Sequence, residues 1–320
     1  MGITLFDISN LMKDESPVFI VGAARSGTSL LYGILLRHSS FKCQQKSNQS
    51  IPRSHESHVF DYPKVAYSSK FALNYILQDK KLHSQFLESI KLIRDYQNFL
   101  GNFLYISCLK KNIFRKTAYK INLSHLVLRT YFYYAKQSRQ VARILEKTPS
   151  HIFRLPEMKV TFPKAKYLFI YRHPVEVFSS YKRRFKMSQE EEFKSAGGKW
   201  LEVSIEKFCK NYRDSIDIAL KEQALNPTKF LAIKYEDMTA NTQLTIQNIC
   251  IFLEELYEED MIVERESKTI WKIDPFLGGK VVKQTKKWQD FISETDAQVI
   301  EDNLSDVMTR LNYSRYTLPI

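Results

Sequence analysis

Residues Val18 to Leu31 read VFIVGAARSGTSLL. The four apolar residues at the start predict a short buried strand, and the glycine that follows them predicts a turn. The next residues, Ser26 to Ser29, are expected to form the first turn of a helix. A strand that turns directly into a helix gathers unpaired backbone N–H groups at the positive end of the helix dipole. The stretch therefore predicts an anion-binding site.

The two glycines of this turn, Gly22 and Gly27, have the spacing of a Walker A loop. In that loop a lysine follows the second glycine and contacts the phosphates of a nucleoside triphosphate. Here Thr28 occupies that position, and Arg25 is the only strong cation of the turn. The turn is thus suited to a phosphate-like group and poorly suited to a magnesium-bound nucleoside triphosphate.

A second basic segment follows the apolar run AKYLFIY, residues 165–171, which is typical of a buried parallel strand. Arg172 comes directly after this run, and Pro174 suits the first turn of a following helix. On such a helix Ser180 and Arg184 are four residues apart and share a face. An ordinary basic helix end is the alternative interpretation of Arg184.

Length and composition favour one α/β domain, residues 1–320, with a helical insert at about residues 65–145. The 320 residues carry a formal charge of +13, which favours an anionic partner. The N-terminal residues contain acids and no long apolar run, so we expect neither a signal peptide nor a membrane anchor. The four cysteines form no C-x2-C pair, which agrees with a reducing compartment. We therefore expect a cytoplasmic protein.

The segment HESHVFD, residues 55–61, places several ionisable residues close together. Glu56 is a candidate general base, and His58 beside it could take the same role. A metal site is a weaker interpretation because the two histidines have no further ligand residues nearby. A polar loop without a special role is the third interpretation.

Taken together, these motifs resemble the sulfotransferase superfamily, whose enzymes use 3′-phosphoadenosine 5′-phosphosulfate (PAPS). The resemblance covers about residues 17–313 and is weakest in the helical insert. It implies a P-loop-like α/β fold, a parallel sheet flanked by helices, and no metal. The 5′-phosphosulfate loop of the family corresponds to the RSGTS stretch: Arg25, Ser26, Gly27, Thr28 and Ser29. Its 3′-phosphate signature, an arginine with a serine eight and an arginine twelve positions later, corresponds to Arg172, Ser180 and Arg184.

The resemblance also implies roles for residues outside these two motifs. Tyr235, in the stretch KYEDM, matches a position near the nucleoside, and Lys287 matches the loop that closes over the cofactor, at about residues 275–291. HESHVFD is similar to the K-E-x-H-F-F-D of heparan-type sulfotransferases, which makes Glu56 the catalytic base. EKTPSH, residues 146–151, is similar to their E-K-T/S-P stretch, which makes Lys147 a charge stabiliser.

The sequence departs from the heparan-type branch at two positions. His55 stands where that branch has lysine, and Arg25 replaces the lysine of its phosphate loop. The Arg-Ser-Gly-Thr form is found in tyrosylprotein and bacterial branches. The acceptor therefore stays open among carbohydrate, glycolipid or other lipid, small metabolite and tyrosine, and the sequence leaves the oligomeric state open.

Two other functions were weighed against a sulfotransferase. A kinase-like enzyme that uses a nucleoside triphosphate shares the phosphate-loop topology, but it predicts a loop lysine, which this sequence lacks. A nucleic-acid-binding module predicts a basic stripe with aromatic platforms, whereas the lysines and arginines here are spread along the chain. We therefore expect no nucleic-acid partner.

Overall fold

The computed structural model describes residues 7, 10, 15–42, 56–58, 60, 81–82, 84–96, 124–189, 199–263 and 287–318. The chain divides into two compact units, and each is described by itself. The first comprises residues 1–17, 40–144 and 154–165, and the second comprises residues 18–39, 145–153 and 166–320. Much of the expected insert and most of the expected closing loop lie outside the described residues, which include 287–291 of that loop.

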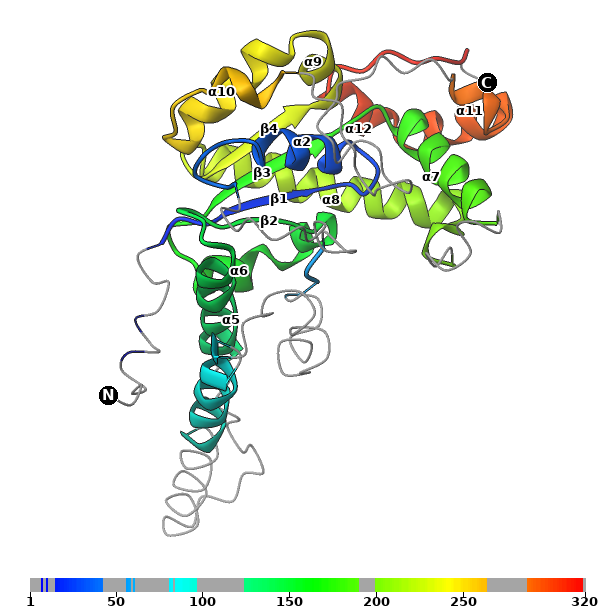
Figure 1. The fold of residues 1–320 in the computed structure, drawn as a ribbon. Helices are drawn as coiled ribbons and strands as arrows, with labels where there is room; N and C mark the ends of the chain where they lie inside the picture. Colours follow the sequence, from blue (N-terminus) through cyan, green and yellow to red (C-terminus); the bar gives the residue numbers. More distant parts are fainter. Residues whose placement is uncertain are drawn as a thin grey trace, which may run out of the picture. The chain divides into compact units, whose positions relative to one another are not determined.

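The second unit contains a four-stranded sheet in the order β2-β1-β3-β4 (Figure 1). All three neighbouring pairs are parallel. The strands are β1 (Val18–Gly22), β2 (Leu145–Lys147), β3 (Lys166–Tyr171) and β4 (Phe230–Lys234). Because the strands are parallel, their carboxyl ends meet at one edge of the sheet, where ligands of open α/β sheets bind.

The core of this unit is built on β1 and β3. Every residue of β1 is buried, as expected for a central strand covered on both faces. The rings of Phe19 and Tyr167 stack across the β1–β3 pair, with centroids 5.7 Å apart. Phe230 extends this stack onto β4, 6.4 Å from Tyr167. The aromatic side chains thus join three strands into one packed layer.

Helices connect and flank the strands of this unit. Helix α2 packs against β1 and β2, α8 and α9 pack against β4, and α11 packs against α7 and α8. The helices are α2 (Thr28–Leu35), α7 (Pro174–Ser188), α8 (Ile205–Leu225), α9 (Tyr235–Ala240), α10 (Thr242–Leu253), α11 (Glu294–Asn303) and α12 (Ser305–Arg310). The short 3₁₀-helices are η2 (Pro149–Arg154), η4 (Lys199–Leu201), η5 (Glu259–Met261) and η7 (Trp288–Asp290).

The described part of the first unit is helical. Helix α5 (Ser124–Arg139) packs against α6 (Leu155–Thr161), and residues 84–96 form a further helix. Phe132 of α5 meets Phe162 edge to face, with centroids 5.2 Å apart. Arg129 of α5 donates from Nε to the carbonyl oxygen of Thr161, 2.7 Å away. This bond caps α6, whose last carbonyl groups have no partner within the helix.

The α/β class with a parallel sheet is confirmed, and the boundaries differ from expectation in three places. Helix α2 begins at Thr28 because Gly27 has a φ of 102°, which a right-handed helix cannot contain. Strand β2 was not expected from its sequence. The expected C-terminal helix is two helices, because Leu304 leaves helical geometry between α11 and α12. The single-domain organisation stays a prediction.

The close approach of β1 to β3 depends on Gly22. A Cβ at this position would lie 2.5 Å from the carbonyl oxygen of Ile170 and 3.3 Å from Cγ2 of Thr28. Gly22→Ala should therefore push the two strands apart and lower the free energy of unfolding by about 1–3 kcal/mol, the usual cost of overpacking. Urea denaturation measures this change.

The double variant Gly22→Ala/Thr28→Ser serves as the control for this prediction. It removes Cγ2 and leaves the backbone carbonyl in place, so it should not restore stability. Recovery in the double variant would show that the side chain of Thr28, and not the strand pairing, requires the glycine.

Candidate active site

The turn between β1 and α2 has an unusual backbone. Arg25 and Gly27 both have positive φ values, 72° and 102°. These conformations turn the chain from the strand into the helix, whose N-terminal turn begins directly after Gly27. Ser26 is fully buried, and its hydroxyl has no hydrogen-bond partner among the described residues. A buried polar group without a partner is costly, so this hydroxyl is well suited to bind a ligand atom.

Tyr235 joins this turn to the end of β3. It is the first residue of α9, directly after β4. A Cβ at Gly27 would lie 2.4 Å from Cδ2 of Tyr235, so the ring packs on the turn where only glycine fits. The guanidinium of Arg172 lies over the same ring, 4.6 Å from its centroid. Burial raises the pKa of Tyr235, and the Arg172 charge opposes that rise.

A direct hydrogen bond joins the two basic motifs that the sequence indicates. Nε of Arg25 donates to Oγ of Ser180 on α7, 3.4 Å away. Ser180 and Arg184 are both buried, one turn apart on that helix. The structure therefore brings the turn after β1 together with the helix after β3. Thr28 and Ser29 form the start of α2 beside them.

The guanidinium of Arg172 has a carboxylate partner that the sequence analysis missed. Its Nη2 donates to Oε2 of Glu176, 2.6 Å away, in the first turn of α7. Both side chains are largely buried, with 10% and 16% of their surface exposed. The spacing of four residues on a helix start is a signal that could have indicated this pair.

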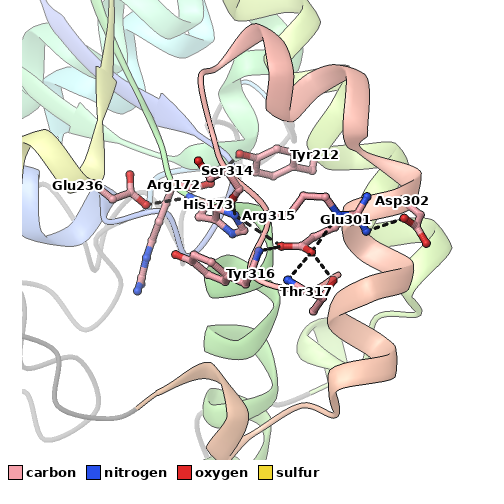
Figure 2. A network of polar contacts seen from close by, with 10 residues as sticks. All are labelled: Arg172, His173, Tyr212, Glu236, Glu301, Asp302, Ser314, Arg315, Tyr316 and Thr317. Atoms are coloured by element: carbon pink, nitrogen blue, oxygen red, sulfur yellow. Dashed lines mark hydrogen bonds and ion pairs between the residues drawn. The ribbon is translucent and has the colours of Figure 1, made fainter. Parts of the chain in front are cut away.

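The peptide group between Arg172 and His173 is held at both of its polar ends (Figure 2). The hydroxyl of Tyr212 on α8 donates to the carbonyl oxygen of Arg172 at 2.6 Å. The N–H of His173 donates to Oε1 of Glu236 on α9 at 3.0 Å. Two helices therefore fix the orientation of the peptide that carries the arginine. No spacing in the sequence connects these residues.

Lys147 is the last residue of β2 and pairs in register with Ile20 of β1. Its side chain is buried, 2% exposed. Beside it, the carboxylate of Glu146 accepts a bond from the Thr148 hydroxyl at 2.5 Å and lies 3.3 Å from Nδ1 of His151. The lysine thus lies at the carboxyl end of the strand next to the phosphate-like turn.

Lys287 has a different environment. It is exposed and precedes η7, and its N–H donates to the side chain of Asp290 at 3.1 Å. The neighbouring Trp288 is buried, and its carbonyl oxygen accepts a bond from the Ser179 hydroxyl at 3.4 Å. The contacts found for Lys287 in the described part of the chain are therefore local, while Trp288 packs on α7.

Glu56 and His58 lie in the first unit and form a pair of their own. Oε2 of Glu56 is 3.3 Å from Nε2 of His58, and about a third of each side chain is exposed, 34% and 38%. His58 has a positive φ of 49°, a conformation that non-glycine residues rarely adopt. Ser57 between them is buried. A carboxylate and an imidazole at this distance can share a proton.

Two searches were limited to the residues that the structure describes. Among them, no three histidine, cysteine, aspartate or glutamate side chains are grouped as metal ligands. No described helix is both long and apolar enough to cross a membrane.

Comparison with solved structures supports the fold. The sulfotransferase domain from the curacin biosynthetic pathway matches with a TM-score of 0.51 at 16% identity, covering 94% of this chain and 98% of that chain. The sulfotransferase domain of the Synechococcus PCC 7002 olefin synthase matches at 16% identity with a TM-score of 0.47, covering 95% and 97%. A sulfotransferase from Alicyclobacillus acidocaldarius matches at 16% identity with a TM-score of 0.45, covering 94% and 97%.

The sequence comparisons give one positive result. No curated protein matches the sequence significantly. The family model described as "Sulfotransferase family" matches residues 17–259, which include both basic motifs, Glu56 and Lys147. Because that match spans most of the sequence, the chain belongs to the sulfotransferase family.

Proposed function

We propose that this sulfotransferase moves the sulfuryl group of PAPS to a hydroxyl or amine acceptor, without a metal. The observation that carries the proposal is the bond between Arg25 and Ser180. It joins a turn suited to one anionic group to a helix suited to another. A ligand with two phosphate-bearing ends on one ribose requires two such neighbouring sites.

The turn after β1 fits the 5′-phosphosulfate end of this ligand. The N-terminus of α2 offers backbone N–H groups and the positive end of its dipole. The buried Ser26 hydroxyl, which has no partner among the described residues, can bond to an anionic oxygen. Arg25 adds a cation on the side of the turn that faces Ser180. These groups together replace the lysine of a nucleotide-triphosphate loop.

The end of β3 fits the 3′-phosphate. Arg172, Ser180 and Arg184 are each 8% exposed, so their bonds to an anion would be screened little by solvent. Arginine suits a phosphate group because its planar fork donates two parallel bonds. Tyr235, which packs under Arg172 and against Gly27, would lie near the nucleoside that connects the two anionic ends.

The remaining roles concern the proton and the developing charge. We assign Glu56 as the base whose carboxylate takes the proton from the acceptor, and His58, 3.3 Å from it, as the alternative base. Lys147 supplies a fixed positive charge at the end of β2. PAPS supplies the sulfuryl group when bound. The acceptor class stays open among carbohydrate, glycolipid and small metabolite, and the cytoplasmic location stays a prediction.

The choice of ligand is tested by thermal unfolding. Adenosine 3′,5′-bisphosphate (PAP), the product of PAPS, should raise the melting temperature by several degrees at 100 times its Kd, because saturation at that level stabilises the fold by about 2.7 kcal/mol. Mg-ATP at the same concentration should raise it little. A larger shift with Mg-ATP, lost on addition of chelator, would contradict the proposal and favour a kinase-like enzyme.

The 3′-phosphate site is tested with Arg184→Ala. Charge-assisted hydrogen bonds contribute about 1.5–3 kcal/mol each, so the affinity for PAP should fall roughly 10- to 150-fold. The affinity for AMP, which has no 3′-phosphate, should change much less. Lys186→Ala, on the exposed side of the same helix, is the matched control and should leave both affinities unchanged. Equal losses for PAP and AMP would assign Arg184 to the fold. Calorimetry measures both.

The base is tested with Glu56→Gln, which keeps the shape of the side chain and removes its basicity. Turnover should fall by about 10²-fold or more, while PAP affinity stays the same. His58→Ala is the comparison, because it removes the partner of Glu56 and leaves the carboxylate. If Glu56→Gln turns over normally and His58→Ala does not, the histidine is the base.

A further inference from the structure

Glu301 is a fully buried carboxylate on α11. A buried charge costs several kcal/mol unless hydrogen bonds and opposite charges compensate it. Its oxygens accept bonds from the N–H of Tyr316 at 2.7 Å, the N–H of Thr317 at 3.1 Å and the hydroxyl of Thr317 at 2.5 Å. Nε of Arg315 lies 3.6 Å from the same carboxylate. Glu301 therefore holds the chain that follows α12 against α11 (Figure 2).

The chain held by Glu301 covers His173. The ring of Tyr316 stacks on the imidazole, with centroids 3.9 Å apart and planes 14° apart. Nε2 of His173 lies 3.1 Å from the carbonyl oxygen of Ser314, which can only accept, so Nε2 carries the proton. Burial lowers the pKa of His173, which favours the neutral ring in this position. The histidine after the phosphate-site arginine is thus packed beneath residues 314–316.

The same chain also supports the peptide group of Arg172. Oε2 of Glu236 accepts a bond from the hydroxyl of Tyr313 at 2.7 Å, while its Oε1 accepts the N–H of His173. Removing the Tyr313 hydroxyl would free the carboxylate that orients this peptide. We call residues 313–317, together with Glu236 and Glu301, the C-terminal clasp.

We infer that the C-terminal clasp determines how strongly the enzyme selects a ligand with a 3′-phosphate. The inference rests on the proposed function, in which Arg172 binds that phosphate. Glu301, Glu236 and Tyr313 are positioning residues that act through the Arg172–His173 peptide. A fixed peptide holds the arginine near its binding orientation, so less conformational entropy is lost when the phosphate binds. A loosened clasp makes that loss larger for ligands that use Arg172 and leaves other ligands unaffected.

The test compares the affinities of PAP and AMP, measured by calorimetry on the full chain. Tyr313→Phe removes one hydroxyl and keeps the ring, and Thr317→Val removes the hydroxyl that Glu301 accepts. Each should weaken PAP by roughly 3- to 10-fold, the value of one hydrogen bond, and leave AMP unchanged. Tyr167→Phe is the matched control, because its buried hydroxyl has no partner among the described residues. It should change neither affinity.

A double-mutant cycle separates positioning from general stability. In an Arg172→Ala background, Tyr313→Phe should no longer change the PAP-to-AMP ratio, because coupling between the two sites disappears with the arginine. An unchanged ratio in both Tyr313→Phe and Thr317→Val, or the same loss with and without Arg172, would overturn the inference. Equal binding of PAP and AMP by the natural sequence would instead contradict the proposed function. The two failures are therefore distinguishable.

Discussion

The close pairing of two parallel strands, β1 and β3, is the constraint on which the site depends. Gly22 pairs with Ile170, and any side chain at Gly22 would clash with the partner carbonyl. At this separation the segments that follow the two strands come within hydrogen-bonding distance, as the Arg25–Ser180 contact shows. Each segment begins a helix, so two helix N-termini and their arginines share one edge of the sheet. Neither segment alone has this concentration of positive potential.

Much of this arrangement could be predicted from local patterns. An apolar run that ends in glycine or in Arg-His-Pro indicates where a strand stops and a helix starts, and those boundaries fix which residues reach the sheet edge. The turn after β1 and the spacing of Ser180 and Arg184 are signals of this kind. Strand β2 escaped prediction because it has three residues, two of them charged, and only its pairing with β1 makes it a strand.

The supporting contacts could not be predicted for a different physical reason. Tyr212, Glu236 and Glu301 act on the Arg172–His173 corner from three helices, and no period or motif connects positions so far apart in the sequence. Buried carboxylates also look the same in a sequence as exposed ones. Their roles emerge only when the donors around them are known, as for the 0% exposed Glu301 and the backbone of residues 316 and 317.

The bond between His173 and Ser314 has a consequence for the order of folding. It closes a loop of 141 residues, and such non-local contacts form late because loop closure costs entropy before the contact stabilises the chain. During synthesis from the N-terminus, both arginine-bearing segments leave the ribosome long before the residues that hold Arg172 in place. The anion-binding edge therefore matures only when the last helices have formed, and a nascent chain has its cations without their final orientation.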